Sequence, residues 1–177
     1  MPVDRLALLR GINVGGRNLV KMTDLRAAFA ELGADDVETH IASGNVLFRG
    51  AVRPADLELA LSERFGVELK AVVLTATQLQ AVVDAAPDGF GAAEERCDVI
   101  FLRRPLTAAH AFSLFDPREG IDRVWKGKGV IYHARLAARA SGSRLSRVAS
   151  LPEYKNMTIR SWSTTSKLAE LMARRAS

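Results

Sequence analysis

Three glycines and two asparagines follow an arginine within residues 10–18, which read RGINVGGRN. Glycine-rich turns present successive backbone N–H groups, and such an array can bind a phosphate or another anion. The spacing comes close to the phosphate-binding loop GxxxxGK[ST], whereas the dinucleotide-binding pattern GxGxxG does not occur. Arg17 and Asn18, however, replace the lysine and the hydroxyl of that loop, and the next helix is predicted to begin only near Thr23. The sequence therefore disfavours a nucleoside triphosphatase of the P-loop class.

Weaker anion binding is compatible with the same residues, and it competes with a purely structural interpretation. In the structural interpretation the glycines permit positive φ, the asparagines make local turn hydrogen bonds, and the arginine pairs with an acid such as Asp24. In the binding interpretation the arginine lies at the rim of an apolar strand face and contacts a ligand oxygen. The candidate binding residues of this segment are Arg10, Gly11, Asn13, Gly15, Gly16 and Asn18.

The elements that must position this segment follow the order β-α-β-β-α-β. An apolar run predicts a strand over residues 3–10, and Thr23 is placed to cap a helix that ends at Gly33. Alternation predicts strands over 36–42 and 46–49, Pro54 opens an amphipathic helix that stops at Gly66, and a strand over 67–75 follows. This order is that of a ferredoxin-like split βαβ unit.

The same topology brings a second motif to the glycine-rich segment. A right-handed crossover makes the first two strands parallel, with the third strand antiparallel between them. The carboxyl ends of the first two strands then lie at one edge of the sheet. We therefore expect residues 10–18 to neighbour the turn that leaves the second strand, and we add that turn to the candidate site. Its residues are Ser43, Gly44 and Asn45.

The second half of the chain repeats part of this pattern. A helix over about 77–86 leads into a linker over 87–97, and then a strand over 98–105, a helix, and a hairpin around the turn KGKG at 126–129 repeat the order β-α-β-β. A terminal helix, capped by Thr158 or Ser161, directs Leu168, Leu171 and Met172 to the core. We predict an α+β protein of two ferredoxin-like subdomains, 1–86 and 98–177, each with an antiparallel or mixed sheet and helices on one face.

Three segments of the chain resemble the bacterial domain of unknown function 1697 (DUF1697) family: LLRGINVGGRN, SGNVLF and TIRSWSTTSKLAEL. The resemblance covers essentially the whole chain. It implies two ferredoxin-like α+β subdomains and brings no established activity. In the third segment, Ser161 and Ser163 stand where the family usually has asparagine. If those asparagines hold a ligand, the resemblance implies weaker or altered binding in this chain.

The resemblance also singles out residues of the third segment as a further part of the site. A helix N-terminus with hydroxyls and an arginine favours an oxyanion. The tryptophan of this segment either stacks on a base or packs between the subdomains, and both interpretations stay open. The residues are Thr158, Arg160, Trp162, Thr164 and Lys167.

Composition limits the class of protein. The formal net charge is +5, and residues 97–177 hold 15 Lys and Arg against 6 Asp and Glu, compared with 10 against 14 in residues 1–96. The basic half indicates either an anionic partner or a solvated surface. No apolar run approaches the length of a membrane-spanning helix, Cys97 has no second cysteine, and the three histidines lack metal-ligand spacing. We expect a cytoplasmic protein without a membrane segment, metal or cofactor.

The sequence favours binding of a phosphate-bearing ligand, a nucleotide or nucleic acid, at the glycine-rich segment. No pair of groups for general acid–base work presents itself, so the sequence does not decide whether the protein is an enzyme. The alternative hypothesis is a non-enzymatic protein–protein interaction module. In that hypothesis the glycine motif forms a rigid corner between the subdomains, and the basic half docks an acidic partner.

Overall fold

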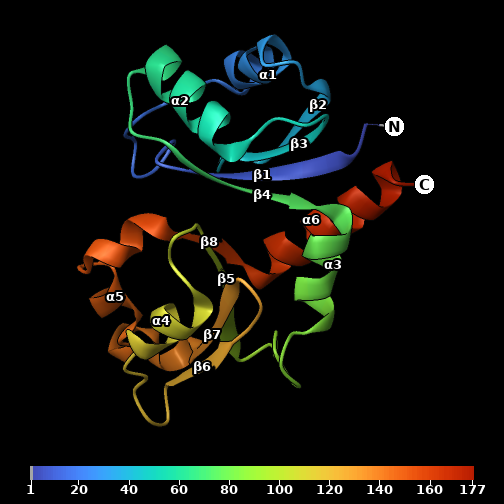
Figure 1. Ribbon diagram of the computed structural model, residues 1–177. Coiled ribbons are helices and arrows are strands. Elements are labelled where there is room, and N and C mark those ends of the chain that lie inside the picture. Colours follow the sequence, from blue (N-terminus) through green and yellow to red (C-terminus); the bar gives the residue numbers. More distant parts are fainter. Residues whose placement is uncertain (1) are drawn as a thin grey trace. The chain divides into compact units, whose positions relative to one another are not determined.

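The computed structural model describes residues 2–177 and divides the chain into two compact units (Figure 1). Unit 1 contains the residues up to Leu79 together with Leu168–Ser177, and unit 2 contains Gln80–Lys167. The chain passes from one unit to the other within two helices, α3 (Ala76–Asp84) and α6 (Trp162–Arg175).

Unit 1 is built on a four-stranded antiparallel sheet with the strand order β2-β3-β1-β4. Since β3 pairs antiparallel with both β1 and β2, these two strands are parallel to each other and end at the same edge, as predicted. This is the strand order of the ferredoxin-like split βαβ unit. The elements are β1 (Asp4–Arg10), α1 (Met22–Glu31), β2 (Asp35–His40), β3 (Asn45–Arg49), α2 (Pro54–Phe65) and β4 (Lys70–Thr75).

Alternate residues of the central strands and one stripe of each helix form the core of unit 1. Phe29 of α1 packs edge-on against Phe48 of β3, with 5.3 Å between the ring centroids. Helix α2 begins with Pro54 in its first turn and ends at Gly66 in the left-handed conformation, as predicted. The buried residues that share this core include Ala7, Leu9, Leu25, Val46, Leu57 and Leu61.

The predicted cap of the first helix is wrong. Helix α1 begins at Met22, and its N-cap position is Lys21, whose side chain makes no capping hydrogen bond. Thr23 therefore lies within the first turn instead of before it. The residues before α1 form the loop that connects this helix to β1.

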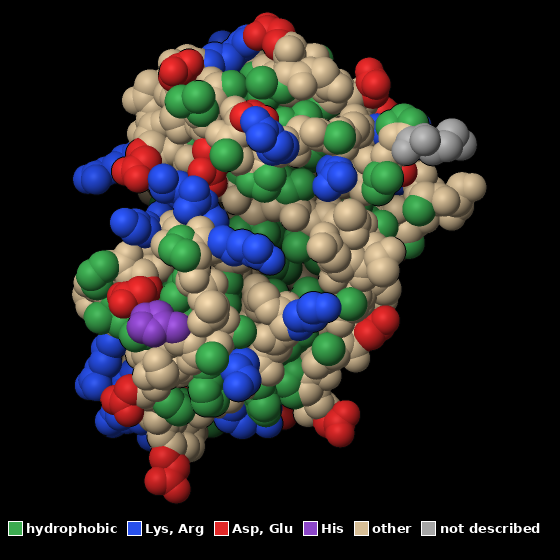
Figure 2. All heavy atoms as spheres, in the orientation of Figure 1, with side chains coloured by type: hydrophobic (Ala, Val, Ile, Leu, Met, Phe, Trp, Pro, Cys, Tyr) green, Lys and Arg blue, Asp and Glu red, His purple; other side chains and the backbone are tan. Residues whose placement is uncertain are grey.

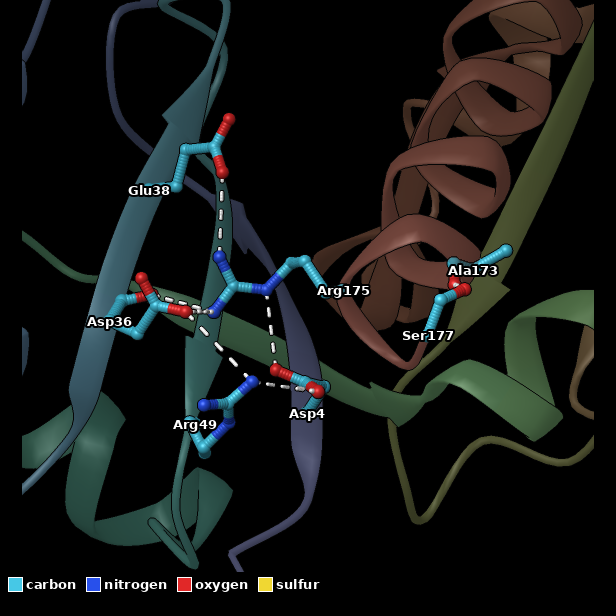
Figure 3. Close-up of polar contacts among 7 residues, drawn as sticks. All are labelled: Asp4, Asp36, Glu38, Arg49, Ala173, Arg175 and Ser177. Atoms are coloured by element: carbon cyan, nitrogen blue, oxygen red, sulfur yellow. Dashed lines mark hydrogen bonds and ion pairs between the residues drawn. The ribbon is translucent and has the colours of Figure 1, made fainter.

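The second half of α6, from Leu168, belongs to unit 1 and ends in an ionic cluster (Figure 3). The Arg175 guanidinium lies 3.3 Å from Asp4, 3.0 Å from Asp36 and 3.4 Å from Glu38, measured to carboxylate oxygens. Arg49 lies 3.4 Å from the Asp4 carboxylate on its other side. The Arg175 side chain is only 10% exposed, so one largely buried cation satisfies carboxylates on both β1 and β2.

Unit 2 repeats the topology of unit 1. Its antiparallel sheet has the order β6-β7-β5-β8, so the first strand of the unit again lies between the third and the fourth. The second crossover is made of short turns instead of one long helix. The elements are β5 (Glu95–Leu102), α4 (Ala108–Ser113), β6 (Asp122–Lys126), β7 (Val130–Leu136), the 3-10 helix η1 (Ala137–Gly142), α5 (Leu145–Val148), the 3-10 helix η2 (Pro152–Asn156) and β8 (Met157–Ser161).

The two faces of this second sheet carry different clusters. On one face Ile100, Ile131 and Met157 pack with Ala111 of α4 and Val148 of α5. On the other face Phe90 makes edge-to-face contacts with three aromatic side chains. The ring centroids lie 5.9 Å away for Trp125, 5.5 Å for Tyr132 and 5.1 Å for Trp162. Phe90 comes from the segment predicted as a linker, and β5 begins at Glu95, before the predicted residue 98.

Candidate functional site

The glycine pair of the first motif forms the tip of a short hairpin. Val14 and Arg17 are bridged, and the Arg17 N–H donates to the Val14 carbonyl over 2.9 Å. Gly15 and Gly16 have φ values of 57° and 74°, and positive φ at both central residues is what a type I′ turn requires. The motif is therefore a projecting turn, and its two glycines are exposed.

The two asparagines hold this hairpin in shape. Asn13 accepts the N–H of Val20 over 2.8 Å, and its amide nitrogen donates to the carbonyls of Val20 (3.2 Å) and Ala42 (2.8 Å). The amide of Asn18 donates to the carbonyl of Gly11 over 2.8 Å. These bonds fix both ends of the hairpin, so the amides act first on the protein's own backbone.

The glycine-rich segment and the SGN turn are neighbours, as the topology predicted. The Leu9 N–H donates to the Gly44 carbonyl over 2.8 Å. A Cβ on Gly44 would lie 3.0 Å from the Leu9 Cβ, and Gly44 has a φ of 84°, so this contact requires glycine. Asn45 is fully buried, and its amide donates to the His40 carbonyl and to the Ser43 hydroxyl. The turn therefore packs against Leu9 and Ile12, at the point where β1 leads into the glycine-rich loop.

The hairpin presents a cation between apolar side chains. Arg17 is exposed, and within residues 2–177 its side chain makes no ion pair or hydrogen bond. Val14 is 66% exposed and Leu19 is 77% exposed, and Ile41 in the adjoining turn is 54% exposed. Sequence reasoning counted Arg17 against a P-loop and did not include it among the site residues. Its position directly after the glycine pair of a I′ turn is the signal that would have found it.

The stretch of sequence that contains the hairpin is basic, although unit 1 holds as many Asp and Glu as Lys and Arg. Residues 5–23 contain four Lys or Arg and no Asp or Glu. One of the four, Arg10, ends β1 and lies opposite Lys70 of β4 in the strand register. In the view of Figure 2, Lys and Arg side chains, in blue, lie on the surfaces of both units. Arg10, Arg17 and Lys21 thus bring positive charge to the segment that contains the hairpin, whereas Lys70 pairs with Glu68, which lies beside Gly11.

The residues of the third motif lie in unit 2. Thr158 and Arg160 lie on one face of β8, opposite Phe101 and Val99 of β5. Thr158 is only 3% exposed, and burial lowers the pKa of Arg160 to about 10, so this guanidinium keeps its charge at pH 7. The structure thus brings the first two motifs together in unit 1, and the third forms a separate group in unit 2.

The start of α6 combines a cap with an aromatic contact. The Ser161 hydroxyl accepts the Thr164 N–H over 3.2 Å, as predicted for one of the two candidate caps, whereas Thr158 lies within β8 and is not the cap. The Trp162 ring packs on Phe90 and lies 2.6 Å from where a Cβ on Gly91 would be. Within unit 2, Trp162 is therefore a packed side chain. Lys167 is half-buried farther along the helix.

Groups for metal or thiol chemistry are sparse in the described chain. Over residues 2–177, no three His, Cys, Asp or Glu side chains are grouped so as to hold a metal ion. Cys97 is buried, and this burial raises the pKa of its thiol. None of the helices in the same residues combines the length and the apolar character needed to cross a membrane.

Comparison with known proteins places the chain among proteins without an assigned activity. The sequence profile of the family described as "Protein of unknown function (DUF1697)" matches residues 3–132. No curated protein matches the chain significantly. Among solved structures, the conserved bacterial protein SP0830 from Streptococcus pneumoniae is similar, with a TM-score of 0.80 and 25% sequence identity, over 97% of this chain and 99% of that one.

Proposed function

We propose that this chain, which belongs to the DUF1697 family of proteins of unknown function, binds phosphate-bearing ligands, and nucleic acid in particular, through the hairpin at residues 13–18. The observation that carries the proposal is the exposed Arg17, whose side chain makes no ion pair or hydrogen bond within residues 2–177. A guanidinium in that position is available to a phosphate oxygen as a charge-assisted donor.

The frame of the hairpin supports this function. Asn13 and Asn18 connect the hairpin to its own loop and to Ala42, directly before the SGN turn, so little conformational entropy is lost when a ligand binds. Gly15 and Gly16 carry no side chains, and a phosphate can therefore approach the backbone at the tip closely. The hairpin is therefore preorganised for binding.

The shape of the hairpin favours an extended polyanion over a mononucleotide. A small ligand is usually held in a concavity, whereas the tip residues of this hairpin are exposed. Val14 and Leu19 add apolar surface beside Arg17, which suits contact with sugars or bases of a single strand. In unit 2, Arg160 remains charged at neutral pH, and we assign it and Lys167 to further contacts with anionic ligands.

The test is the salt dependence of binding to a labelled single-stranded oligonucleotide, measured by fluorescence anisotropy. We expect the affinity to fall steeply between about 50 and 300 mM salt, because phosphate contacts release counterions. Arg17→Ala should weaken binding about tenfold and lower the salt slope by roughly one unit. Lys128→Ala is the matched control, since Lys128 is an exposed cation at the other hairpin turn and should change affinity less than about twofold.

Two results would overturn the nucleic-acid proposal. The first is an affinity that does not change with salt, which would exclude phosphate tracking. The second is equal loss of affinity in the Arg17 and Lys128 variants, which would indicate a diffuse charge effect. Binding of ATP with the same Arg17 dependence, without oligonucleotide binding, would assign the hairpin to a nucleotide instead. If the protein binds neither the oligonucleotide nor ATP but does bind an acidic protein, the result would favour the interaction module.

A further inference from the structure

We propose that unit 2 contains a second anion site, which binds a small organic phosphate about the size of a nucleoside monophosphate. A cavity of about 540 Å³ lies between β5, β7 and residues 140–149, within unit 2. This volume falls within the range of small-molecule sites and is several times that of an orthophosphate ion. All residues that line this cavity belong to unit 2, whereas the hairpin belongs to unit 1.

Two arginines supply the charge in the lining of the cavity. Arg96 of β5 and Arg135 of β7 are directly opposite each other in the strand register, and both line the cavity. Like charges in opposite positions of an antiparallel pair destabilise the sheet. An anion bound between the two guanidinium groups would convert this repulsion into two charge-assisted contacts.

The acids of the protein neutralise only part of this charge. Asp98 lies 3.0 Å from Arg135 and pairs with it, whereas Arg96 makes no ion pair or hydrogen bond through its side chain within residues 2–177. The surrounding stretch, residues 123–152, contains seven Lys or Arg and no Asp or Glu. The remaining positive charge at the cavity therefore favours an anion over a neutral or cationic ligand.

Serine hydroxyls add uncharged donors around the same cavity. Ser141, Ser143 and Ser146 line it. The Ser143 hydroxyl is already used, since it donates to Asp122 over 2.6 Å and accepts the Leu145 N–H over 3.2 Å. Over the described chain, the hydroxyls of Ser141 and Ser146 make no hydrogen bond, so they remain available to phosphate oxygens.

A buried carboxylate fixes the wall that carries these serines. Asp122 of β6 accepts the N–H of Arg118 over 3.0 Å and the N–H of Arg144 over 2.9 Å, besides the Ser143 hydroxyl. On its other side it lies 3.2 Å from Nε2 of the buried His133. Residues 143 and 144 are thereby clamped to the sheet, and the cavity is preformed.

The rest of the lining is apolar and suits the organic part of the ligand. Leu145, Ile159 and Tyr154 contribute the larger side chains of this lining, and Ala140 and Ala149 contribute small ones. Arginines and hydroxyls at one part of a cavity, with aliphatic and aromatic surface at the rest, match a phosphomonoester with a ring system.

Isothermal titration calorimetry with adenosine 5′-monophosphate, adenosine and inorganic phosphate tests the proposal. We expect binding of the monophosphate, weaker binding of phosphate alone, and none of adenosine. Arg96→Ala should weaken the monophosphate about tenfold or more, because it removes a charge-assisted donor. Arg147→Ala is the matched control, since Arg147 belongs to the same basic stretch, pairs with Asp116 and does not line the cavity. The affinity of Arg147→Ala for the monophosphate should stay within about twofold of that of the wild type.

A second variant and a spectroscopic readout make the result decisive. Ala149→Glu introduces a carboxylate at an exposed lining position and should abolish monophosphate binding while the circular dichroism spectrum is unchanged. Amide resonances of β5 and β7 should shift on titration in the wild type and in Arg17→Ala alike. Binding that Arg96→Ala and Ala149→Glu both leave intact would overturn the proposal, and so would equal binding of adenosine and the monophosphate.

Discussion

Nε of Arg175 lies 3.3 Å from the carboxylate of Asp4, although 171 positions separate the two residues in the sequence. The same guanidinium reaches Asp36 and Glu38 on the next strand of parallel direction, β2. The end of α6 is thus connected to the strand that begins the chain. The ionic cluster of unit 1 therefore depends on Arg175, which comes from the second of the two sequence segments that form this unit.

Removal of this guanidinium should destabilise unit 1. Arg175→Ala leaves Asp4 and Asp36 with Arg49 and removes the ion pair of Glu38, and Asp4 is largely buried. We expect the free energy of unfolding to fall by about 2 kcal/mol, because the largely buried Asp4 carboxylate loses the buried guanidinium that pairs with it. Urea denaturation followed by circular dichroism measures the change.

The neighbouring arginine provides the control for this experiment. Arg174 pairs with Glu170 on the exposed surface of α6, and Arg174→Ala should cost less than about 0.5 kcal/mol. Equal effects of the two substitutions would contradict a specific function of Arg175. High salt should remove only part of the effect of Arg175→Ala, since the exposed Asp36 and Glu38 are screened whereas the Arg175–Asp4 pair is largely buried.

The tight contact between the SGN turn and β1 predicts a steric cost at Gly44. Gly44→Ala would place a Cβ 3.0 Å from the Leu9 Cβ and 3.2 Å from its carbonyl oxygen. Gly33 has nearly the same φ, 83° against 84°, but a Cβ added there would meet no atom within 4 Å. We expect Gly33→Ala to cost about 1 kcal/mol and Gly44→Ala about 2–3 kcal/mol, measured by thermal denaturation. Equal costs would show that the contact can relax.

The asparagine that braces the hairpin should control binding without contacting the ligand. Asn13→Ala removes three hydrogen bonds, including the one that connects the loop to Ala42, the residue before the SGN turn. We expect oligonucleotide affinity to fall roughly three- to tenfold, because the loop must then be ordered on binding. The salt slope should stay the same, since no phosphate contact is removed. A changed slope with unchanged affinity would contradict this function.

The buried histidine of unit 2 predicts a pH dependence of stability. Burial lowers the pKa of His133, although Asp122 acts in the opposite direction. Between its folded pKa and the unfolded value of about 6.5, the unfolded chain binds more protons, so stability falls as the pH falls through this window. Urea denaturation at pH values from about 7 down to 5 should show this loss. His133→Gln should flatten the slope, and an unchanged slope would assign it to other groups.

Protonation of His133 is costly for a reason visible in its hydrogen bonds. Its Nε2 faces the Asp122 carboxylate, which only accepts, so Nε2 carries the proton in the neutral ring. Within the described residues, Nδ1 is buried and has no partner, and a second proton there would be neither solvated nor hydrogen-bonded. Asp122 itself is buried, which alone would raise its pKa, but the N–H of Arg144 and the Ser143 hydroxyl hold that pKa below its usual value.

Local pattern was sufficient to predict the topology of unit 1 and the proximity of the two motifs at its edge. Strand alternation, helix periodicity and the handedness of the crossover determine that arrangement, and none of them depends on distant side chains. The duplicated β-α-β-β order could be read in the same way. The helix start was less well defined, because the Lys21 backbone takes the cap position and no side chain marks it.

Long-range polar contacts could not be predicted from the sequence. Periodicity does not reveal that Arg175 pairs with Asp4. It also does not reveal that Ser143 and His133 both hydrogen-bond to Asp122. Nor does it distinguish an asparagine that binds a ligand from one that holds a loop, as Asn13 does. Arg96 and Arg135 lie 39 positions apart, and only the register of β5 and β7 brings them together. These contacts depend on tertiary structure.

The division of unit 1 into two sequence segments has a consequence for synthesis on the ribosome. The chain completes all of unit 2 by residue 167, before the residues 168–177 that unit 1 still needs have been made. N-terminal domains generally fold first during synthesis. Here unit 1, although it contains the first residues of the chain, receives its last residues only after all of unit 2 has been made. Until the end of α6 has been made, Asp4 and Asp36 have Arg49 as their ion-pair partner, and Glu38 gains its partner only with Arg175.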